Sequence, residues 1–402
     1  MDFTLSKDLE VLRQQVRGFI DEHVLPVEAD RANWNEYDNI KLAERDALRQ
    51  KARAAGLWAP QISAERGGLG LTMAGQAMFY EEASRSIFGP SAFNCAAPDD
   101  GNMRLLEKVG TDDQKARWLQ PIVDGAVNSA FAMTEPHPGS GSDPAMMRTR
   151  AERRGGHWVV SGRKWYISGA DVAQHFILVA RTDDNADERR RHLSGFLFDR
   201  DQPGWRIVRR IENMGPDEHG GVCEMEFTGL EIADENRLMD VGDGLKLTQI
   251  RLGPARLTHC MRWLGLAKRA LAIAAAYIAE REGFGTRLAE RESVQLKMGE
   301  AARAIQTGRL LVMHAAWMLD QGDFARKEVS IAKVHVADTL HLAADTALQL
   351  LGARGYSTDT IVEWIYRYAR CARLVDGASE VHNMVLARFY ADEGDEFWHW
   401  GA

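Results

Sequence analysis

The period of the apolar residues changes twice along this 402-residue chain, and that change limits the fold more than any other feature. Up to about residue 127, apolar residues recur at helical spacing, as at Leu9, Leu12 and Val16. Short runs rich in aromatic and β-branched residues follow, separated by Gly, Asp and Pro, which is typical of β-strands. The helical period then returns. The sequence therefore predicts a multidomain α+β protein: a helical domain over 1–127, a β-barrel or sandwich over 128–238 and a helical domain over 239–402.

The same pattern places the expected elements. The β-rich runs cover 158–160, 164–167, 176–179, 196–198, 205–208 and 224–227. The helices expected in the last part cover 245–282, 290–320, 325–351, 359–371 and 379–392. Gly352 and Gly355 separate the third of these helices from the fourth, because glycine interrupts a helical pattern.

Composition argues against several classes of protein. The net charge of −8 makes a broad nucleic-acid-binding surface unexpected. No run of 18 apolar residues occurs and the N-terminus lacks a signal-peptide pattern, so we expect no membrane insertion. The 12 histidines show no HExxH motif, which predicts no metal centre. Four widely spaced cysteines without a CxxC pair predict reduced thiols and a cytoplasmic protein; they are Cys95, Cys223, Cys260 and Cys371.

Two segments of the β-rich part carry residues suited to a planar ligand. Met133 and Thr134 run into a loop that contains Ser142, where hydroxyls and free backbone N–H groups can bind carbonyl or phosphate oxygens. The simpler interpretation is an ordinary turn between strands. In segment 162–169, alternation puts Trp165 and Ile167 on one face and Tyr166 and Ser168 on the other. An aromatic ring beside a hydroxyl can wall a flat heterocycle, although a strand with one buried face is again the simpler interpretation.

Three segments of the C-terminal part are also candidates. Arg281 and Phe284 suit a pyrophosphate and a ring, or they belong to a helix end with a C-cap glycine. After Gln349, Gly352 and Gly355 allow a close approach of the backbone to a ligand. Asp376 precedes an expected helix start. It is either an N-cap or a base whose ionised form the helix dipole favours.

In their order and spacing these segments resemble the acyl-CoA dehydrogenase family, from Gly67-Gly68-Leu69-Gly70 to Arg388. The chain is most similar to a clade with Ala97-Pro98-Asp99-Asp100-Gly101-Asn102-Met103 and with Asp376-Gly377 in place of the usual Glu-Gly. The resemblance implies an N-terminal helical domain, a middle β-barrel and a C-terminal four-helix bundle. It also implies that FAD lies between the barrel and the bundle and is completed by a neighbouring subunit.

The resemblance implies roles for individual residues. Met133 and Thr134 would meet the edge of the flavin ring, and Tyr166 and Ser168 would lie against it where the family usually has Trp and Thr. Ser142 would contact phosphate groups of the cofactor or of CoA. The residues that would reach the FAD of a partner subunit are Arg281, Phe284, Gln349 and Gly352. A homodimer or homotetramer is therefore expected.

The implied reaction is α,β-dehydrogenation of an acyl-CoA thioester to the trans-2-enoyl-CoA, as in β-oxidation of fatty acids. Asp376 matches the catalytic carboxylate and would take the α-proton, while the β-hydrogen leaves as hydride to flavin N5. Arg256 matches an arginine of the active-site helix, and Gly377 follows the base in the substrate-binding segment. The backbone N–H of Asp376 and a ribityl hydroxyl of FAD would stabilise the enolate. An electron-transferring flavoprotein would take the electrons.

Departures from the family pattern keep other interpretations open. Asp is one methylene shorter than Glu, and Asp in this place also occurs in a related oxidase that deprotonates nitroalkanes. Ala255 occupies the position where some members carry the base, so no second acid competes with Asp376. The loop 135–142 is two residues longer than usual and contains His137 and Pro138. His219 is interpreted as structural or as a CoA-side contact.

Two further interpretations concern the ligand. Some family members bind DNA through an extra basic C-terminal region, but this chain ends in acidic residues. A flavin-binding scaffold without activity is disfavoured because an ionisable acid is retained at Asp376. By analogy, residues 93–103 line the inner acyl cavity, where Phe93, Asn94 and Cys95 with Asp99 and Asp100 form a mixed surface. A short-to-medium, branched or polar-substituted acyl group is expected.

Overall fold

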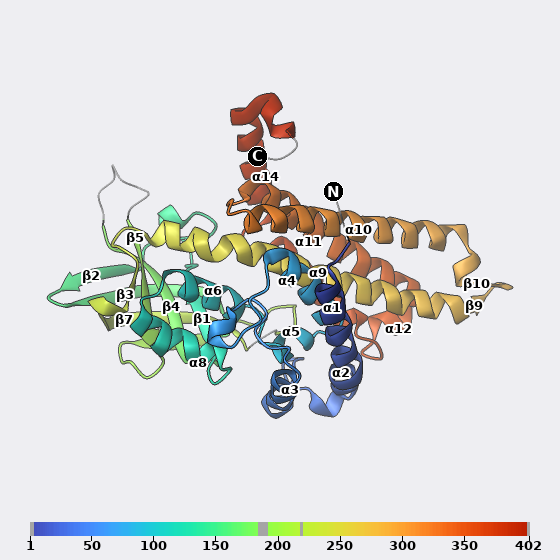
Figure 1. Ribbon diagram of the computed structural model, residues 1–402, viewed down its shortest axis with the longest axis horizontal. Helices are drawn as coiled ribbons and strands as arrows, with labels where there is room; N and C mark the ends of the chain where they lie inside the picture. Colours follow the sequence, from blue (N-terminus) through green and yellow to red (C-terminus); the bar gives the residue numbers. More distant parts are fainter. Residues whose placement is uncertain (1–3, 184–191, 218–219, 400–402) are drawn as a thin grey trace.

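The computed structural model describes residues 4–183, 192–217 and 220–399; His219 lies outside them. The described chain passes from helices through a β-sheet and back to helices, which confirms the predicted order of α, β and α parts (Figure 1). The sheet lies at one end of the molecule. One long helix runs from it toward the opposite end, two further long helices lie beside that helix, and the N-terminal helices pack along them (Figure 1).

The N-terminal part consists of short helices around the well-buried helix α4. Its helices are α1 (Lys7–Phe19), α2 (Leu25–Ala29), α3 (Leu42–Ala54), α4 (Met73–Ala83), α5 (Gly89–Ala92), α6 (Asp99–Val109), α7 (Asp112–Gln114) and α8 (Gln120–Val123). The start of α4 is fixed by Asp320 from the C-terminal part, whose carboxylate accepts from the N–H groups of Met73 (2.7 Å) and Ala74 (3.0 Å). A carboxylate at a helix N-terminus satisfies free N–H groups and complements the dipole, so this contact joins the two helical parts.

The β-rich part forms one sheet. Its strands are β1 (Ser129–Ala132), β2 (Arg150–Arg154), β3 (His157–Ser168), β4 (His175–Arg181), β5 (Leu193–Asp199), β6 (Trp205–Arg210), β7 (Val222–Ala233) and β8 (Arg237–Leu238). Among the described residues the order is β6-β7-β3-β2-β4-β5-β8, and β1 pairs with β4 in parallel. Aromatic rings fill the sheet's own core, where Phe176 stacks on Phe198 with centroids 4.7 Å apart.

A β-bulge interrupts β3 and changes which residues share a face. The register against β7 shifts between Lys164 and Ile167, and Tyr166 adopts a left-handed φ of 51°. The extra residue lets Lys164 and Ile167 both point inward, so both are buried. The predicted alternation, with Trp165 and Ile167 on one face, is therefore wrong. Tyr166 and Ser168 nevertheless both remain exposed.

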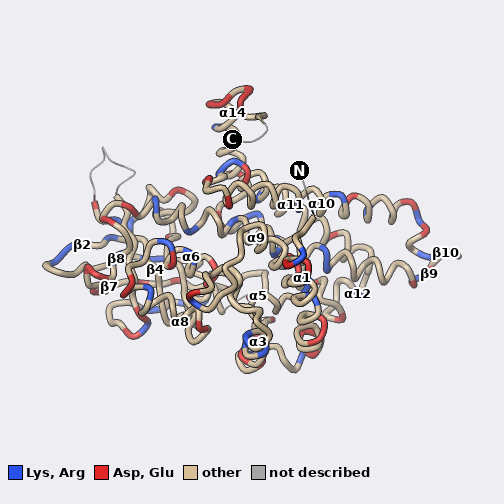
Figure 2. The backbone as a smooth tube through the Cα atoms, in the orientation of Figure 1, with Lys and Arg blue, Asp and Glu red and all other residues tan. Residues whose placement is uncertain are grey.

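Long helices make up the C-terminal part. They are α9 (Gly244–Glu280), α10 (Glu292–Asp320) and α11 (Arg326–Leu351), followed by α12 (Ala353–Tyr356), α13 (Val362–Ala369) and α14 (Ser379–Glu393). The first three bury small and aliphatic residues against one another, as at Ala267, Ala337 and Ala344. Helix α14 buries little and stands off the body (Figure 1), and acidic residues gather at its far end (Figure 2). No described helix is long and apolar enough to cross a membrane.

The end of α9 differs from the expectation. The helix stops at Glu280, and the next residues form a small hairpin of β9 (Glu282–Gly283) and β10 (Thr286–Arg287). Phe284 (φ 54°) and Gly285 (φ 82°) make its tip. Two successive residues with positive φ are typical of a tight hairpin turn. The alternative of a helix ending in a C-cap glycine is therefore wrong.

Candidate active site

The carboxylate of Asp376 lies in a nearly closed site between α9 and the segment that precedes α14. Its side chain is 17% exposed, and its Oδ2 lies 3.4 Å from His259 Nε2 on α9. Its Oδ1 lies 3.8 Å from a terminal nitrogen of Arg251, about two turns before His259 on the same helix. The first residue of α14 follows Ala378, which is the cap. Asp376 is therefore not an N-cap, because its carboxylate faces α9.

The backbone around Asp376 is strained and held by two cations. Asp376 adopts φ 52° and Gly377 φ 100°, both in the region that disfavours side chains. Arg256 donates its Nε–H to the carbonyl oxygen of Asp376 at 2.8 Å. Lys333, fully buried on α11, donates to the carbonyls of Ala372 (2.9 Å) and Gly377 (2.8 Å). Such strain persists where surrounding contacts enforce it, as it does at many functional sites.

The charges around Asp376 keep it ionised. Burial alone would raise the pKa of Asp376, but His259 and the guanidinium groups of Arg251 and Arg256 outweigh it and hold that pKa below the ordinary value. His382 lies between α11 and the same loop. Its Nδ1 is 3.1 Å from Oγ of Ser330 on α11, and its Nε2 faces Gly377 in the loop. Burial lowers the pKa of His382 to about 4, so this imidazole is neutral at pH 7. The site thus holds a buried carboxylate that is ready to accept a proton.

Arg251 links Asp376 to the N-terminal and β parts. Its guanidinium donates to Asn102 Oδ1 at 3.3 Å and lies 4.9 Å from the centroid of the Phe131 ring at the end of β1. Asn102 in turn donates to Ser129 Oγ at 2.9 Å. One buried arginine, Arg251, therefore connects the segment around Asp376 with α6 and β1. Its contact on β1, Phe131, is two residues before Met133.

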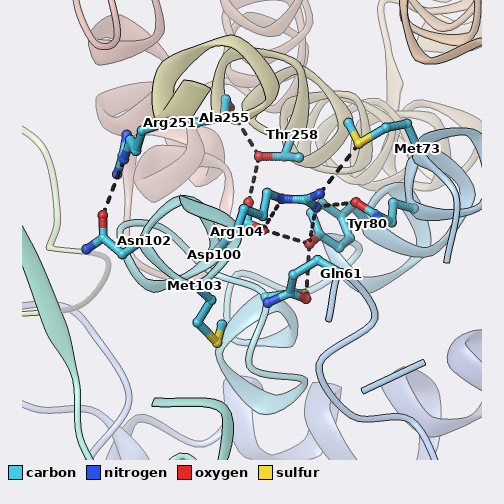
Figure 3. A network of polar contacts seen from close by, with 12 residues as sticks. Gln61, Met73, Tyr80, Asp100, Asn102, Met103, Arg104, Arg251, Ala255 and Thr258 are labelled. Atoms are coloured by element: carbon cyan, nitrogen blue, oxygen red, sulfur yellow. Dashed lines mark hydrogen bonds and ion pairs between the residues drawn. The ribbon is translucent and has the colours of Figure 1, made fainter. Parts of the chain in front are cut away.

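Next to this connection lies a second buried network centred on Asp100 (Figure 3). Oδ1 of Asp100 accepts from Tyr80 Oη and Arg104 Nε, each at 3.0 Å, and Oδ2 accepts from Thr258 Oγ1 at 2.7 Å. Arg262 approaches Oδ2 at 3.3 Å. Asp99 is buried too, and accepts from the N–H and hydroxyl of Ser129. Both carboxylates are thus satisfied by protein groups rather than presented to a cavity, which removes the basis for a mixed acyl-cavity surface made by these acids.

The residues predicted to meet the flavin edge lie together. The N–H of Trp165 donates to the carbonyl of Thr134 at 3.0 Å, which ties the bulge of β3 to the loop after β1. Beneath it, the buried ammonium of Lys164 donates to the carbonyl of Met133 (2.8 Å) and to Glu135 Oε1 (2.9 Å). Above it, the ring of Tyr166 is 53% exposed. Thr134 therefore lies beside the bulge of β3, and Tyr166 and Ser168 are exposed on that strand.

Glu135 organises the longer loop that follows. Its carboxylate accepts from the backbone N–H groups of Arg148 (2.7 Å), Thr149 (2.9 Å) and Ser140 (3.3 Å). The loop is therefore fastened at its middle and at its end. Ser142 lies exposed between these two points.

The remaining candidates lie elsewhere. Arg281 and Phe284 belong to the hairpin at the far end of α9, and Gln349 and Gly352 lie at the end of α11. These two ends are neighbours, since the guanidinium of Arg354 lies 5.9 Å from the centroid of the Tyr277 ring on α9. The candidates thus form two groups, one around Asp376 and the flavin-edge residues and one at the opposite end of the long helices (Figure 1).

Sequence profiles of the acyl-CoA dehydrogenase N-terminal, middle and C-terminal domains match residues 6–126, 130–230 and 242–391. The chain belongs to the acyl-CoA dehydrogenase family. It is 37% identical over 402 residues to a "probable acyl-CoA dehydrogenase FadE2" of Mycobacterium tuberculosis, with 96% of each chain covered. It is 34% identical to "acyl-CoA dehydrogenase family member 11" of Rattus norvegicus, of which it spans about half, 51% of that protein and 96% of this chain.

Solved structures of family members confirm the fold. A putative acyl-CoA dehydrogenase from Mycobacterium abscessus superposes with a TM-score of 0.91 at 36% identity, covering 97% of this chain and all of that one. A glutaryl-coenzyme A dehydrogenase in complex with glutaryl-CoA gives a TM-score of 0.84 at 28% identity, covering 100% of this chain and 99% of that one. The predicted fold class and enzyme class are therefore confirmed: the protein is an oxidoreductase of this family.

Several residues that shape the acyl-CoA dehydrogenase site were not among the sequence candidates. Arg251, His259 and Lys333 surround the base segment but sit inside helical patterns as single polar residues. The signal available in the sequence was the position of each one, a single polar residue on the apolar face of α9 or α11. A polar residue on a buried face must find a partner, and here that partner is the segment around Asp376.

A pH-dependent test follows from the buried Lys164. Burial lowers the pKa of Lys164 to about 8 from an ordinary 10.5, although Glu135 opposes the shift. The cost of keeping this ammonium charged is therefore present below pH 8 and is relieved as the pH rises toward 10.5. We expect the free energy of unfolding of the wild type, relative to Lys164→Met, to rise by on the order of 2–3 kcal/mol across this window. Urea unfolding of both proteins at several pH values measures it, and a falling difference would contradict the assignment.

Proposed function

We propose that this member of the family catalyses FAD-dependent α,β-dehydrogenation of an acyl-CoA thioester to the trans-2-enoyl-CoA, with Asp376 as the base. The observation that supports it most is the buried, ionised carboxylate of Asp376 on a strained backbone. Among the described residues, none makes a well-aligned hydrogen bond to its buried Oδ2, although His259 Nε2 lies 3.4 Å away. A carboxylate oxygen has two lone pairs, so one of them stays available to a substrate proton beside His259.

The surroundings of Asp376 suit abstraction of an α-proton. The α-proton of a thioester is weakly acidic, so the developing enolate needs positive charge or N–H donors close by. Arg251, Arg256 and Lys333 supply that charge without consuming the free carboxylate oxygen. When an acyl chain displaces water, the loss of hydration raises the pKa of the carboxylate and makes it a stronger base.

The residues present also fit a flavin. Tyr166 offers an exposed ring at a strained φ, and Thr134 and Ser168 offer hydroxyls nearby. A buried ion pair holds these segments in place, as a planar ligand requires. When bound, FAD supplies the acceptor for the β-hydrogen as hydride. Tyr166 and Ser168 would pack against its ring, and Met133 and Thr134 would hold its polar edge. An electron-transferring flavoprotein is the acceptor that we propose for the electrons.

The candidate residues at the far ends of α9 and α11 support a proposal about the oligomer. Phe284 is wholly exposed at the tip of its hairpin, and Gln349 and Gly352 are exposed nearby. We propose that these residues and Arg281 complete the FAD site of a partner subunit in a homodimer or homotetramer. Within its own chain the ring of Phe284 has a distant contact with the guanidinium of Arg291, 5.8 Å from the ring centroid, so it contributes little to the stability of that chain.

Phe284→Ala is expected to weaken FAD binding by about 10-fold, the loss of one aromatic contact, without lowering the stability of the apoprotein. Equilibrium dialysis of FAD against the apoprotein measures it, beside a thermal melt. Phe324→Ala is the matched control, because Phe324 is also a strongly exposed phenylalanine but lies between α10 and α11. Equal FAD affinity of the two variants would count against the proposed assembly.

The direct test is an anaerobic titration of the purified protein, reconstituted with FAD, with a series of acyl-CoA thioesters. Bleaching of the flavin by a thioester, slow to reverse in air, is the expected result. The acyl group is proposed to be short to medium, with branched thioesters bleaching faster than palmitoyl-CoA. No bleaching by any thioester, together with oxygen uptake on a nitroalkane, would instead establish an oxidase that uses the same Asp376.

A further inference from the structure

His259 has a geometry that links it to the base and to little else. It lies on α9 three residues after Arg256, and its ring stacks on Trp263 with centroids 5.3 Å apart and 27° between the planes. Its Nε2 faces Asp376 Oδ2 at 3.4 Å. Its Nδ1 is buried and, within the part of the chain that the structure describes, has no hydrogen-bond partner.

The unpartnered Nδ1 indicates which nitrogen carries the hydrogen. A buried N–H without an acceptor is costly, whereas a lone pair without a donor is tolerated more readily. The favoured tautomer therefore has its hydrogen on Nε2, where Asp376 Oδ2 can accept it. The stack on Trp263 fixes the plane of the His259 ring. Because both residues belong to α9, the direction of this N–H is fixed relative to that helix.

Asp376 needs such a partner because the other cations nearby do not fix its Oδ2. Arg251 approaches Oδ1, and Arg256 and Lys333 hold the carbonyl oxygens of Asp376 and Gly377. These three contacts leave Oδ2 unconstrained. His259 lies on the side of Oδ2 and at 3.4 Å is slightly beyond a usual hydrogen bond, a looseness common before a substrate is bound.

We propose that His259 is a positioning residue that, by donating Nε2–H to Oδ2, fixes the plane and reach of the Asp376 carboxylate for proton abstraction. This inference rests on the proposed function, in which Asp376 is the base. It gives a role to a histidine that neither gives nor takes a proton in the proposed reaction. It also explains how an aspartate one methylene shorter than the usual glutamate can be held in a single productive orientation.

Two substitutions separate the hydrogen bond from the packing. His259→Phe keeps a flat ring against Trp263 but has no donor, whereas His259→Gln keeps an N–H near Nε2 but loses the ring. The readouts are the rate of flavin bleaching by a thioester, the dissociation constant of that thioester, and the exchange of its α-hydrogens with D2O. Bound FAD and thermal melts check that both variants fold. His175→Gln is the matched control, because His175 also contacts a carboxylate, Asp199 at 2.8 Å, in the β part.

We expect His259→Phe to slow bleaching and α-hydrogen exchange by about 100-fold with little change in the thioester dissociation constant, since misplacing a reacting group costs on this scale. His259→Gln should recover most of both rates, and His175→Gln should match the wild type. If His259→Phe matches the wild type, or if Phe and Gln lose the same rate, the positioning role is overturned. Asp376→Asn run beside them separates the two claims: bleaching by that variant at the wild-type rate would overturn the proposed function itself.

Discussion

Replacing Asp376 with Asn is expected to slow flavin reduction by an acyl-CoA thioester by about 10²–10⁴-fold, the usual effect of removing a general base. The amide keeps the size of the side chain and can still contact His259, but it cannot accept the α-proton. Stopped-flow absorbance under anaerobic conditions measures the rate. Because Arg256 and Lys333 hold the backbone of the segment rather than its carboxylate, the loop should keep its conformation and FAD should remain bound.

Asp338→Asn is the matched control for this change. Asp338 is a half-exposed carboxylate paired with Arg373 at 2.6 Å on the outside of α11, so the control also removes one negative charge near an arginine. Its rate should equal that of the wild type. Wild-type bleaching by Asp376→Asn would show that another group takes the proton, and Ala255 excludes the other position from which family members supply one.

The largest expected loss of stability comes from Asp100→Asn. Burial opposes ionisation of Asp100, but Arg104 and Arg262 more than offset it and hold the pKa of Asp100 below its ordinary value. Asn keeps the shape but removes the charge, which leaves two buried guanidinium groups without their carboxylate. Breaking a buried ion pair in this way costs about 3–5 kcal/mol, which we expect as the loss in the free energy of unfolding. Urea unfolding at pH 7 measures it.

The pH dependence of this loss has a definite sign. Because the folded pKa of Asp100 lies below its ordinary value of 3.8, its stabilising contribution is present above pH 3.8 and is lost as the pH falls further. The difference between the wild type and Asp100→Asn should therefore persist at pH 5 and shrink in strong acid. Glu226→Gln, which breaks exposed pairs with Arg163 and Arg206, should leave the stability almost unchanged, because exposed ion pairs contribute little. An equal loss in both variants would contradict the assigned role of the buried network.

The sequence was sufficient for features that repeat locally. Helices α10 and α11 begin and end within two residues of their predicted bounds, since their apolar stripes continue without interruption. The strands predicted at 176–179 and 196–198 lie within β4 and β5, because their apolar runs are also uninterrupted. The candidate base was also placed from sequence, but only through the family resemblance. Its local pattern alone favoured an N-cap.

Features that depend on contacts across the chain were not predictable in this way. The roles of Arg251 and His259 require α9 to lie against a segment more than 110 residues away, which no local pattern encodes. The bulge in β3 follows from the pairing with β7 and from the buried Lys164, not from the propensities of Trp165 or Tyr166. By analogy, Asp100 was expected on the surface of the acyl cavity, whereas in the fold its carboxylate accepts from Tyr80 of α4 and Thr258 of α9.

Helix α9 has 37 residues, with Arg256 about a third of the way along it and the Phe284 hairpin just beyond its C-terminal end. At 1.5 Å per residue, the stretch from Arg256 to Glu280 alone measures about 36 Å. A flavin placed beside Asp376 is thus out of reach of the hairpin of its own chain. Two defective chains, one altered at Asp376 and one at Phe284, would therefore complement each other when assembled together, because a mixed oligomer would contain some sites in which both residues are intact.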